Sequence, residues 1–419
     1  MSIASLLKDI PIPDLMHVKY KFHGYPACDY KKVLNDQINM KKLLSNLKPG
    51  ARVGITAGSR GVSDLPIIIK EIVDKVKQAG GSPFVFPAMG SHGGATAEGQ
   101  RLVLKKLGIT EDFIGCEICS SMETVLVGRS STGLPVYMDK FAWESDGVIV
   151  LNRVKPHTTF RGNHESGIVK MLVIGMGKQK GAEICHQLGF KNMAQNIEDI
   201  AKVVLSTNKV LFGVGVVENP DHQICCLDTA EPEEFFEKDA KMLKSAWDNL
   251  PRLPFSKVDV LVIDEIGKEI SGTGFDTNAV GRANADFPEV TRIAVLNLSE
   301  KTAGNANGIG RADTTTKKVF ERFSFEETYP NAITSTAVES VRIPMILDND
   351  ELAIKAAIKM SLAPNLSKIR LVRIKNTSNL GDLYISSALL DTVKGRSDVY
   401  VCNESLVPLI FNVDGNIKS

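Results

Sequence analysis

Hydrophobic and polar positions in the first 160 residues follow a repeated order of strand, turn and helix. Residues 51–61 (ARVGITAGSRG) predict a short buried strand and a glycine-bearing turn. The apolar positions of residues 64–81 then recur at helical spacing. Pro66 stands near the first turn of this predicted helix, and the Gly80–Gly81 pair marks its end.

The same order recurs in the next hundred residues. Residues 82–94 (SPFVFPAMGSHGG) predict a second strand and loop, and residues 96–108 predict a helix with Thr96 as N-cap and Gly108 as its end. Residues 147–152 (GVIVLN) predict a third strand. Strands that alternate with helices are typical of an α/β fold with a mostly parallel sheet.

A second α/β domain is expected after a proline-rich stretch near residue 254 (LPRLPFSK). Strand patterns follow at residues 258–267, 290–300 and 368–375, with a helical pattern at residues 351–362. The sequence therefore predicts two α/β domains, residues 1–252 and residues 253–419. The final strand pattern, residues 398–403 (DVYVCN), fits either domain.

Composition indicates a protein without a nucleic-acid or membrane partner. The chain of 419 residues has 50 basic and 49 acidic side chains, and 43% of its residues are hydrophobic. We find no apolar stretch of about 18 residues and no basic segment before an apolar run at the start. The seven cysteines are scattered, which favours reduced thiols, so we expect a cytoplasmic protein. Only Cys116 and Cys119 form a CxxC pair, and the lack of a second pair argues against a structural zinc site.

Each of the three predicted strands is followed by a loop that carries a chemically capable side chain. These side chains are Arg60, His92 and His157. In open parallel sheets, ligand sites form where the strands end, so the three residues are candidates for one site. Each also has an ordinary alternative, because an Arg in a turn is often solvated and a loop His often caps or lies on the surface.

Residues 155–186 hold three of the seven histidines, His157, His164 and His186. Lys170 lies in an apolar segment that we interpret as strand-like, and burial would lower the pKa of its amine. His186, on a predicted short helix, offers an imidazole that suits nickel, zinc or copper. The alternatives are a strand lysine that faces solvent and a structural histidine. The sequence contains no HExxH, GxSxG or P-loop motif.

These residues together resemble the LarA-type lactate racemase superfamily. The resemblance depends on Arg60, on GSHGGATAEG with His92, on KPHTTFRG with His157, on SGIVK with Lys170, and on His186 sixteen positions later. The stretch AGNANGIGRADTTTKK is similar to the C-terminal part of many members. Members of this superfamily use a nickel-pincer nucleotide (pyridinium-3,5-bisthiocarboxylic acid mononucleotide nickel) and have two α/β domains with the active site in the cleft between them.

The resemblance implies a role for each candidate residue. Lys170 would tether the cofactor, His186 would ligate nickel, and His92 and His157 would act as alternating general bases. Arg60 would bind the substrate carboxylate, and the cofactor phosphate would be held by Lys178, Lys180 and Lys301. The implied activity is racemisation or epimerisation of a 2-hydroxy acid through hydride transfer, with the pincer-cofactor maturation enzymes as partners. The sequence leaves the oligomeric state open.

The chain departs from the usual family pattern at three places. Ala57 replaces an acidic residue, Ile168 and Val169 replace two glycines, and the segment between His157 and Lys170 is longer and contains RGNHE. Arg161, His164 and Glu165 in this insert suggest a substrate larger than lactate, such as a sugar acid. Three alternatives remain: a related hydride-shuffling isomerase or oxidoreductase with the same cofactor, a non-catalytic binding protein for a small acid or the cofactor, and an ordinary zinc or magnesium enzyme.

Overall fold

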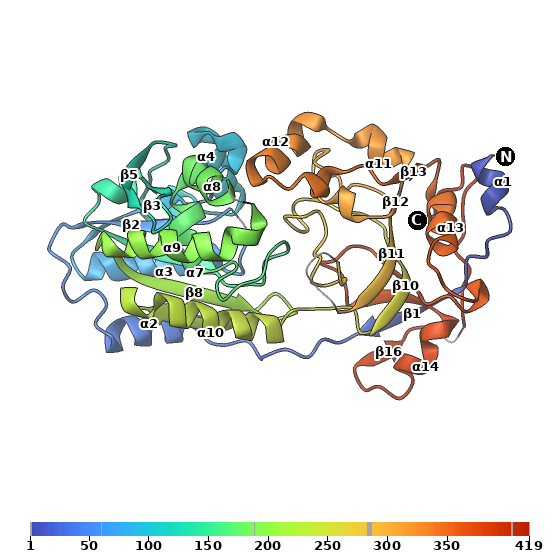
Figure 1. The fold of residues 1–419 in the computed structure, drawn as a ribbon. Helices are drawn as coiled ribbons and strands as arrows, with labels where there is room; N and C mark the ends of the chain where they lie inside the picture. The colour runs from blue at the N-terminus through green and yellow to red at the C-terminus, as the bar shows by residue number, and fades with distance from the viewer. Residues whose placement is uncertain (1, 60, 188, 283–286, 404, 419) are drawn as a thin grey trace. The chain divides into compact units, whose positions relative to one another are not determined.

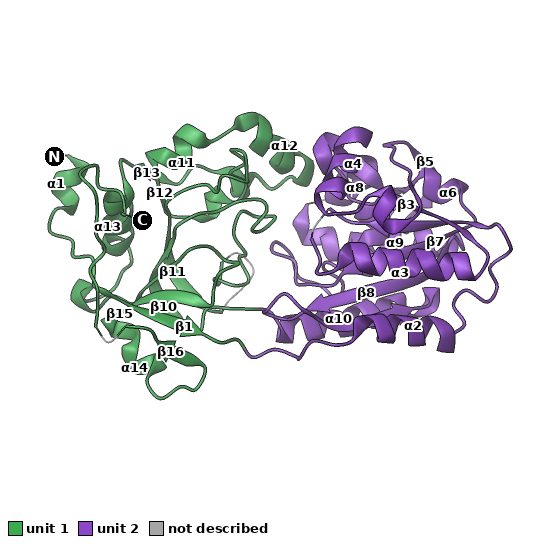
Figure 2. Ribbon diagram, turned by 180° about the vertical axis from the view of Figure 1, so that it is seen from behind, with its two compact units in different colours: residues 1–22, 251–419 green, residues 23–250 purple. Residues whose placement is uncertain are grey.

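The computed structural model describes residues 2–59, 61–187, 189–282, 287–403 and 405–418. The chain forms two compact units (Figure 2). Unit 2 consists of residues 23–250, and unit 1 combines residues 1–22 with residues 251–419. The first 22 residues therefore do not belong to the N-terminal domain in which the sequence prediction placed them.

Unit 2 is built on a six-stranded sheet with the order β4-β3-β2-β7-β8-β9 (Figure 1). All neighbouring strands are parallel except β8 and β9. A separate antiparallel hairpin is formed by β5 (Thr124–Arg129) and β6 (Pro135–Asp139). The strands of the main sheet are β2 (Arg52–Ala57), β3 (Ser82–Pro87), β4 (Glu117–Ile118), β7 (Gly147–Arg153), β8 (Val210–Glu218) and β9 (Ile224–Ala230).

Helices cover both faces of this sheet. One face packs against α2 (Tyr30–Met40), α3 (Leu65–Gln78), α4 (Ala97–Lys106) and α5 (Glu111–Ile114). The other packs against α6 (Lys140–Glu144), α7 (Ile168–Lys170), α8 (Lys178–His186), α9 (Met193–Ser206) and α10 (Phe235–Asp248). The predicted signals hold for α3 and α4, since Pro66 lies in the first turn of α3 and the Thr96 hydroxyl accepts a hydrogen bond from Gly99 N at 3.0 Å.

The apolar segment around Lys170 is helical, so its strand-like interpretation is wrong. It forms α7, the π-helix η2 (Met171–Gly175) and then α8. Ile168, Val169, Met171, Leu172 and Val173 are all buried. A short run in which nearly every side chain is apolar has no period that separates a buried helix from a buried strand. A single π-helical turn of this kind is frequent at functional sites.

Unit 1 contains an eight-stranded mixed sheet with the order β13-β12-β11-β10-β14-β15-β1-β16. The last predicted strand, now β16, pairs with β1 and so belongs to unit 1. The strands are β1 (Leu15–Tyr20), β10 (Lys257–Ile263), β11 (Glu289–Val295), β12 (Thr314–Thr316), β13 (Met345–Leu347), β14 (Leu371–Ile374), β15 (Asp382–Ser386) and β16 (Val399–Val401). The helices are α1 (Ile3–Leu7), α11 (Lys317–Arg322), α12 (Phe325–Ser335), α13 (Asp350–Lys359) and α14 (Leu390–Val393).

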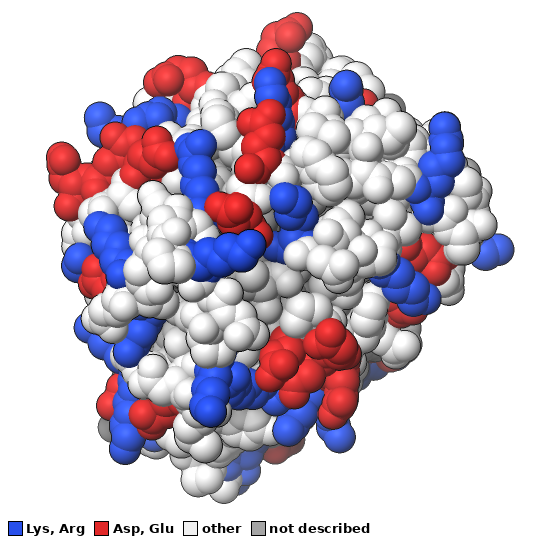
Figure 3. Space-filling model, turned by 90° about the vertical axis from the view of Figure 1, so that its left-hand side faces the viewer, with Lys and Arg blue, Asp and Glu red and all other residues white. Residues whose placement is uncertain are grey.

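The surface reflects the balanced charge of the chain. Lys and Arg side chains are interspersed with Asp and Glu on the face drawn in Figure 3. Among the described residues, no helix has the length and apolar character needed to cross a membrane.

Candidate active site

Three neighbouring strands of unit 2 bring the predicted loops to one edge of the sheet. Strands β3, β2 and β7 are adjacent and parallel, and the loops with His92, Arg60 and His157 follow them. Arg60 itself lies outside the described residues. Its loop begins beside the Lys170 segment, because a Cβ on Gly58 would stand 3.3 Å from Met171 Cε and 3.7 Å from Asn152 Oδ1. Parallel topology thus gathers the loops that the sequence analysis singled out.

His92 lies directly before the short 3₁₀ helix η1 (Gly93–Ala95) and is partly buried. Its Nδ1 is 2.7 Å from the carbonyl oxygen of Met89. Because a carbonyl oxygen only accepts, Nδ1 carries the proton in the neutral ring and the lone pair is on Nε2. Nε2 is therefore the atom through which His92 can take a proton.

His157 has the opposite arrangement of its ring nitrogens. The backbone N–H of Thr159 donates to His157 Nδ1 at 3.1 Å, so the lone pair is on Nδ1 and Nε2 carries the proton in the neutral ring. Burial holds the pKa of His157 well below its usual range, and the nearby positive charges of Lys170 and Lys155 lower that pKa further. His157 is therefore a neutral imidazole at neutral pH.

The RGNHE insert supports the His157 loop. The loop is closed by a pair of backbone hydrogen bonds between Lys155 and Ser166. Glu165 Oε2 accepts from His157 N, and Arg161 Nη1 donates to His157 O, both at 2.6 Å. The Arg161 guanidinium also lies over the ring of Trp247, 4.9 Å from its centroid.

The third polar residue of the insert, His164, points to α10. Its Nδ1 is 3.1 Å from Asp239 Oδ2, and both side chains are buried. Asp239 also explains why glycine precedes α7, because a Cβ on Gly167 would lie 2.0 Å from Asp239 Oδ1. Arg161, His164 and Glu165 thus contact the protein around the loop, and the suggestion that they suit a substrate larger than lactate stays a prediction.

Lys170 is the last residue of α7 and His186 is the last residue of α8, with the π-helix η2 between them. Lys170 Nζ is 3.4 Å from Ser166 Oγ and 5.9 Å from the centroid of the Phe160 ring. His186 Nδ1 is 2.6 Å from the carbonyl oxygen of Ala182, which places the lone pair on Nε2. Burial lowers the pKa of His186, and the charge of Lys170 adds to this effect, so this ring is also neutral at neutral pH.

Two phenylalanines that the sequence analysis missed lie among these groups. The His157 ring is 4.4 Å from Phe160, the His186 ring is 5.6 Å from Phe190, and the two phenylalanine rings are 6.5 Å apart, centroid to centroid. The two rings thus connect the candidate base to the candidate metal ligand. A single Phe in a polar loop has no periodic signal, so the sequence offered no means of finding them.

Comparison with known proteins identifies the domain family of the N-terminal part of the chain. Residues 19–198 match the family model described as the lactate racemase N-terminal domain. The fold is similar to that of the lactate racemase apoprotein from Thermoanaerobacterium thermosaccharolyticum, with a TM-score of 0.50, 14% sequence identity, and coverage of 87% of this chain and 99% of that chain. Residues 19–198 of this chain therefore form a lactate racemase N-terminal domain, and the fold resembles that of the lactate racemase apoprotein.

Two further comparisons add little to this assignment. A protein from Thermotoga maritima matches with a TM-score of 0.46 and 14% identity, over 65% of this chain and 72% of that chain. A search of curated proteins found no match.

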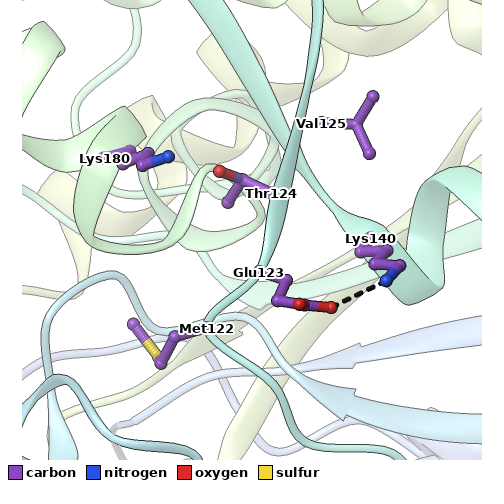
Figure 4. Close-up of a pocket in the computed structure, with 6 residues that line it drawn as sticks. All are labelled: Met122, Glu123, Thr124, Val125, Lys140 and Lys180. Carbon is purple, nitrogen blue, oxygen red and sulfur yellow. Dashed lines mark hydrogen bonds and ion pairs between the residues drawn. The ribbon is translucent and has the colours of Figure 1, made fainter.

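Of the three lysines predicted to hold a cofactor phosphate, Lys178 is not accessible in this structure. Its side chain is completely buried, and its Nζ is 3.0 Å from Asp139 Oδ2, so it cannot reach a ligand. Lys180 is exposed, lies 5.5 Å from the centroid of the Tyr137 ring, and lines an open pocket of about 600 Å³ (Figure 4). Within that pocket, Glu123 and Lys140 point to each other and form an ion pair of 2.8 Å. Lys301 is exposed in a turn of unit 1.

The side chains around His186 suit a metal ion that is already coordinated by a cofactor and needs few ligands from the protein. Among the described residues, no group of three or more His, Cys, Asp and Glu side chains could hold a metal ion. Cys116 and Cys119 pack in hydrophobic clusters on opposite faces of the sheet, which rules out a common zinc ion for this pair. The nickel-pincer nucleotide that the resemblance implies would need a neutral imidazole and a lysine amine from the protein. The neutral His186 ring and the Lys170 amine are the side chains that would supply them.

Proposed function

We propose that this protein, which contains a lactate racemase N-terminal domain, is a racemase or epimerase of a 2-hydroxy acid that uses a nickel-pincer nucleotide. The observation that carries the proposal is the His186 ring, which is neutral and oriented by the Ala182 carbonyl so that the Nε2 lone pair can bind a metal. Lys170 and the His157 ring lie beside the same Phe160 ring, which is next to the Phe190 ring that His186 contacts, so the three groups are close together.

In this proposal, His186 Nε2 would ligate nickel and the Lys170 amine would be the point of covalent attachment. When bound, the nucleotide supplies a reversible acceptor for the α-hydrogen of the substrate. Lys180 and Lys301 remain candidates for its phosphate. Arg60 would bind the substrate carboxylate through its planar guanidinium.

His92 takes the proton of the substrate hydroxyl. The Met89 carbonyl holds the ring with the lone pair on Nε2, so a proton can be accepted there without a change of tautomer. The ring then carries a positive charge, and the same carbonyl stabilises the Nδ1–H of the imidazolium.

His157 differs, because Nε2 already carries the proton in its neutral form. In this state the ring donates a hydrogen bond from Nε2 to a substrate oxygen. It can act as a base through Nε2 only if a proton moves to Nδ1, which breaks the hydrogen bond from Thr159 N. The two histidines therefore begin the reaction in different roles, and the opposite enantiomer requires this change of tautomer at His157.

The decisive experiment is intact-mass and nickel analysis of protein produced together with the enzymes that build the pincer cofactor. We expect an added mass that Lys170→Ala abolishes and bound nickel that His186→Ala loses. Lys202→Ala, which changes a well-exposed lysine on α9, is the matched control and should retain both signals. Absence of both added mass and nickel from the unmodified chain would contradict the proposal.

The reaction itself is tested with a panel of chiral 2-hydroxy acids of increasing size. A racemase or epimerase should invert C2 and return deuterium placed there to the product. The alternative is a related isomerase or oxidoreductase with the same cofactor, and the difference between His92 and His157 favours it, because such a reaction needs only one base. Transfer of the deuterium from C2 to another carbon of the product, or accumulation of a keto acid, would select this alternative.

A further inference from the structure

A buried polar network lies beneath the loop that carries His92. Its members are Lys178, Asp139 and Gln100, whose side chains are all completely buried. Lys178 Nζ lies 3.0 Å from Asp139 Oδ2, 3.0 Å from Gln100 Oε1 and 2.5 Å from the carbonyl oxygen of Pro87, the last residue of β3. The ammonium group is thus surrounded by three acceptors. We call these three residues the Lys178 network.

Gln100 connects this network to the His92 loop. Its Nε2 donates to the carbonyl oxygen of Gly90 at 2.9 Å and to that of His92 at 3.2 Å. The same side chain accepts from Lys178 through Oε1. Only an amide offers an acceptor on one side and two donors on the other, so Gln100 matches all three neighbours at once.

Stability alone does not account for this arrangement. Removing an ammonium and a carboxylate from water costs several kcal/mol for each ion, and well-packed apolar side chains often replace such a pair without loss of stability. Lys178 also adopts a φ of 55°, in the left-handed region that non-glycine residues rarely occupy. Features of this kind persist where they orient a functional group.

The Lys178 network is connected to two candidate functional residues, His92 and His186. The backbone carbonyl of His92 accepts a hydrogen bond from Gln100, and the His92 ring is hydrogen-bonded to the carbonyl of Met89. Lys178 is the first residue of α8, and His186 is the last. One rigid helix therefore joins the network to the candidate metal ligand.

We propose that Lys178, Asp139 and Gln100 are positioning residues that fix the His92 loop on the helix that ends in His186. The inference rests on the proposed function, in which His92 is a base. Gln100 is the member best suited to a test, because it is uncharged and its substitution leaves the Lys178–Asp139 ion pair in place.

Two variants and one control separate positioning from stability. Gln100→Glu keeps an acceptor for Lys178 and removes the donors to Gly90 O and His92 O, whereas Gln100→Met removes both. Gln37→Met is the matched control, because Gln37 Oε1 also accepts a backbone hydrogen bond in unit 2, from Thr229 N at 2.7 Å. The readouts are the ¹⁵N resonances of the His92 ring in cofactor-free protein and the rate of turnover in loaded protein.

In the unmodified chain we expect the His92 ring to carry its proton on Nδ1 and the Gln100 side-chain amide to exchange slowly with solvent. Both Gln100 variants should lose the preference for Nδ1–H and lower kcat by about 10- to 100-fold, since small displacements of a catalytic group have effects of this size. Gln37→Met should resemble the unmodified chain. Folded Gln100 variants with an unchanged His92 signal and a kcat within about twofold of the original would overturn the proposal.

The ring resonances keep this test independent of the proposed function. If no 2-hydroxy acid is turned over, the proposed function fails, and the His92 tautomer still decides whether the network positions the ring. If neither variant folds, the proposal is tested on the unmodified chain. Slow exchange of the Gln100 side-chain amide together with a proton on His92 Nδ1 would support the positioning role. Rapid exchange of that amide would contradict it.

Discussion

Units 1 and 2 both have parallel strands that end in polar loops, but these loops contain different kinds of side chain. In unit 2 the loops and the adjoining helices present His157 and His186, whose pKa values are lowered by burial. In unit 1 the corresponding loops contain buried or half-buried amides and hydroxyls that bond to the loops themselves. Asn307 Nδ2 donates to Gly272 O at 2.8 Å, and Thr302 Oγ1 donates to Asn305 O at 2.7 Å.

The difference shows how polar loops at the end of a sheet are to be interpreted. An uncharged side chain whose hydrogen bonds end within its own loops maintains the shape of those loops. An imidazole whose pKa is displaced and whose tautomer is set by a neighbour is prepared for chemistry. Sequence alone shows both kinds of loop as polar and glycine-rich, so the partners of each side chain have to be known.

The largest expected effect concerns the buried charges under the unit 2 loops. Lys178→Met leaves Asp139 buried without its partner and should lower the free energy of unfolding by about 3–5 kcal/mol. Urea denaturation of cofactor-free protein measures this change. Lys180→Met, two residues further along on the exposed side, is the control and should change stability by less than about 0.5 kcal/mol.

The double variant Lys178→Met with Asp139→Leu removes both charges, so it should recover much of the lost stability. If Lys178→Met alone is as stable as the original chain, the ion pair has no structural importance and the contrast between the units is weaker than we infer.

A smaller effect is expected in the loops of unit 1. Asn307→Ala removes the donor to Gly272 O and the acceptor for Ser340 Oγ, which lies 2.9 Å away. Leaving these groups unpaired should cost about 1–3 kcal/mol. Because we assign Asn307 a structural role, turnover by the folded, loaded variant should be unchanged. A folded variant of normal stability with a strongly reduced kcat would place Asn307 in the site instead.

The smallest effect is the pH dependence of stability. His157 and His186 have pKa values below the value of about 6.5 expected in the unfolded chain, so the unfolded state binds more protons as the pH falls through that value. Their contribution is complete above about pH 6.5 and is lost on acidification, by at most about 1.4 kcal/mol per pH unit for each group.

Unfolding at pH 7.5 and at pH 5.5 measures this loss, and it should be reduced in His157→Asn and in His186→Asn. If both variants show the same pH dependence as the original chain, the two rings are not held neutral by their surroundings.

Much of the fold follows from local patterns in the sequence. The caps of α4, the proline of α3 and the alternation of strands and helices were all predicted, because each depends on residues that are near one another in the chain. The convergence of the His92 and His157 loops was also predictable, since parallel strands end at the same edge of a sheet.

The predictions from sequence failed where contacts between residues far apart in the chain determine the structure. Lys178 and Lys180 look alike in GKQKG, but Asp139 and Gln100 bury only the first. The helical form of the Lys170 segment depends on its burial between the sheet and other helices, and the position of the first strand depends on partners more than 350 residues later. The roles of Arg161 and Glu165 likewise became clear only from their contacts with the His157 backbone.

The pairing of β1 with β15 and β16 has a consequence for the synthesis of the protein. Unit 2 is encoded entirely between the two parts of unit 1, so it can fold while the ribosome is still adding residues. Strand β1 emerges first, but its partners follow only after most of the chain has been made. At about 5–20 residues per second, β1 waits roughly 20 to 70 s with the side chains of Leu15, Met16 and Val18 uncovered. During that interval the nascent chain exposes the apolar segment of β1, and we expect a chaperone to bind there.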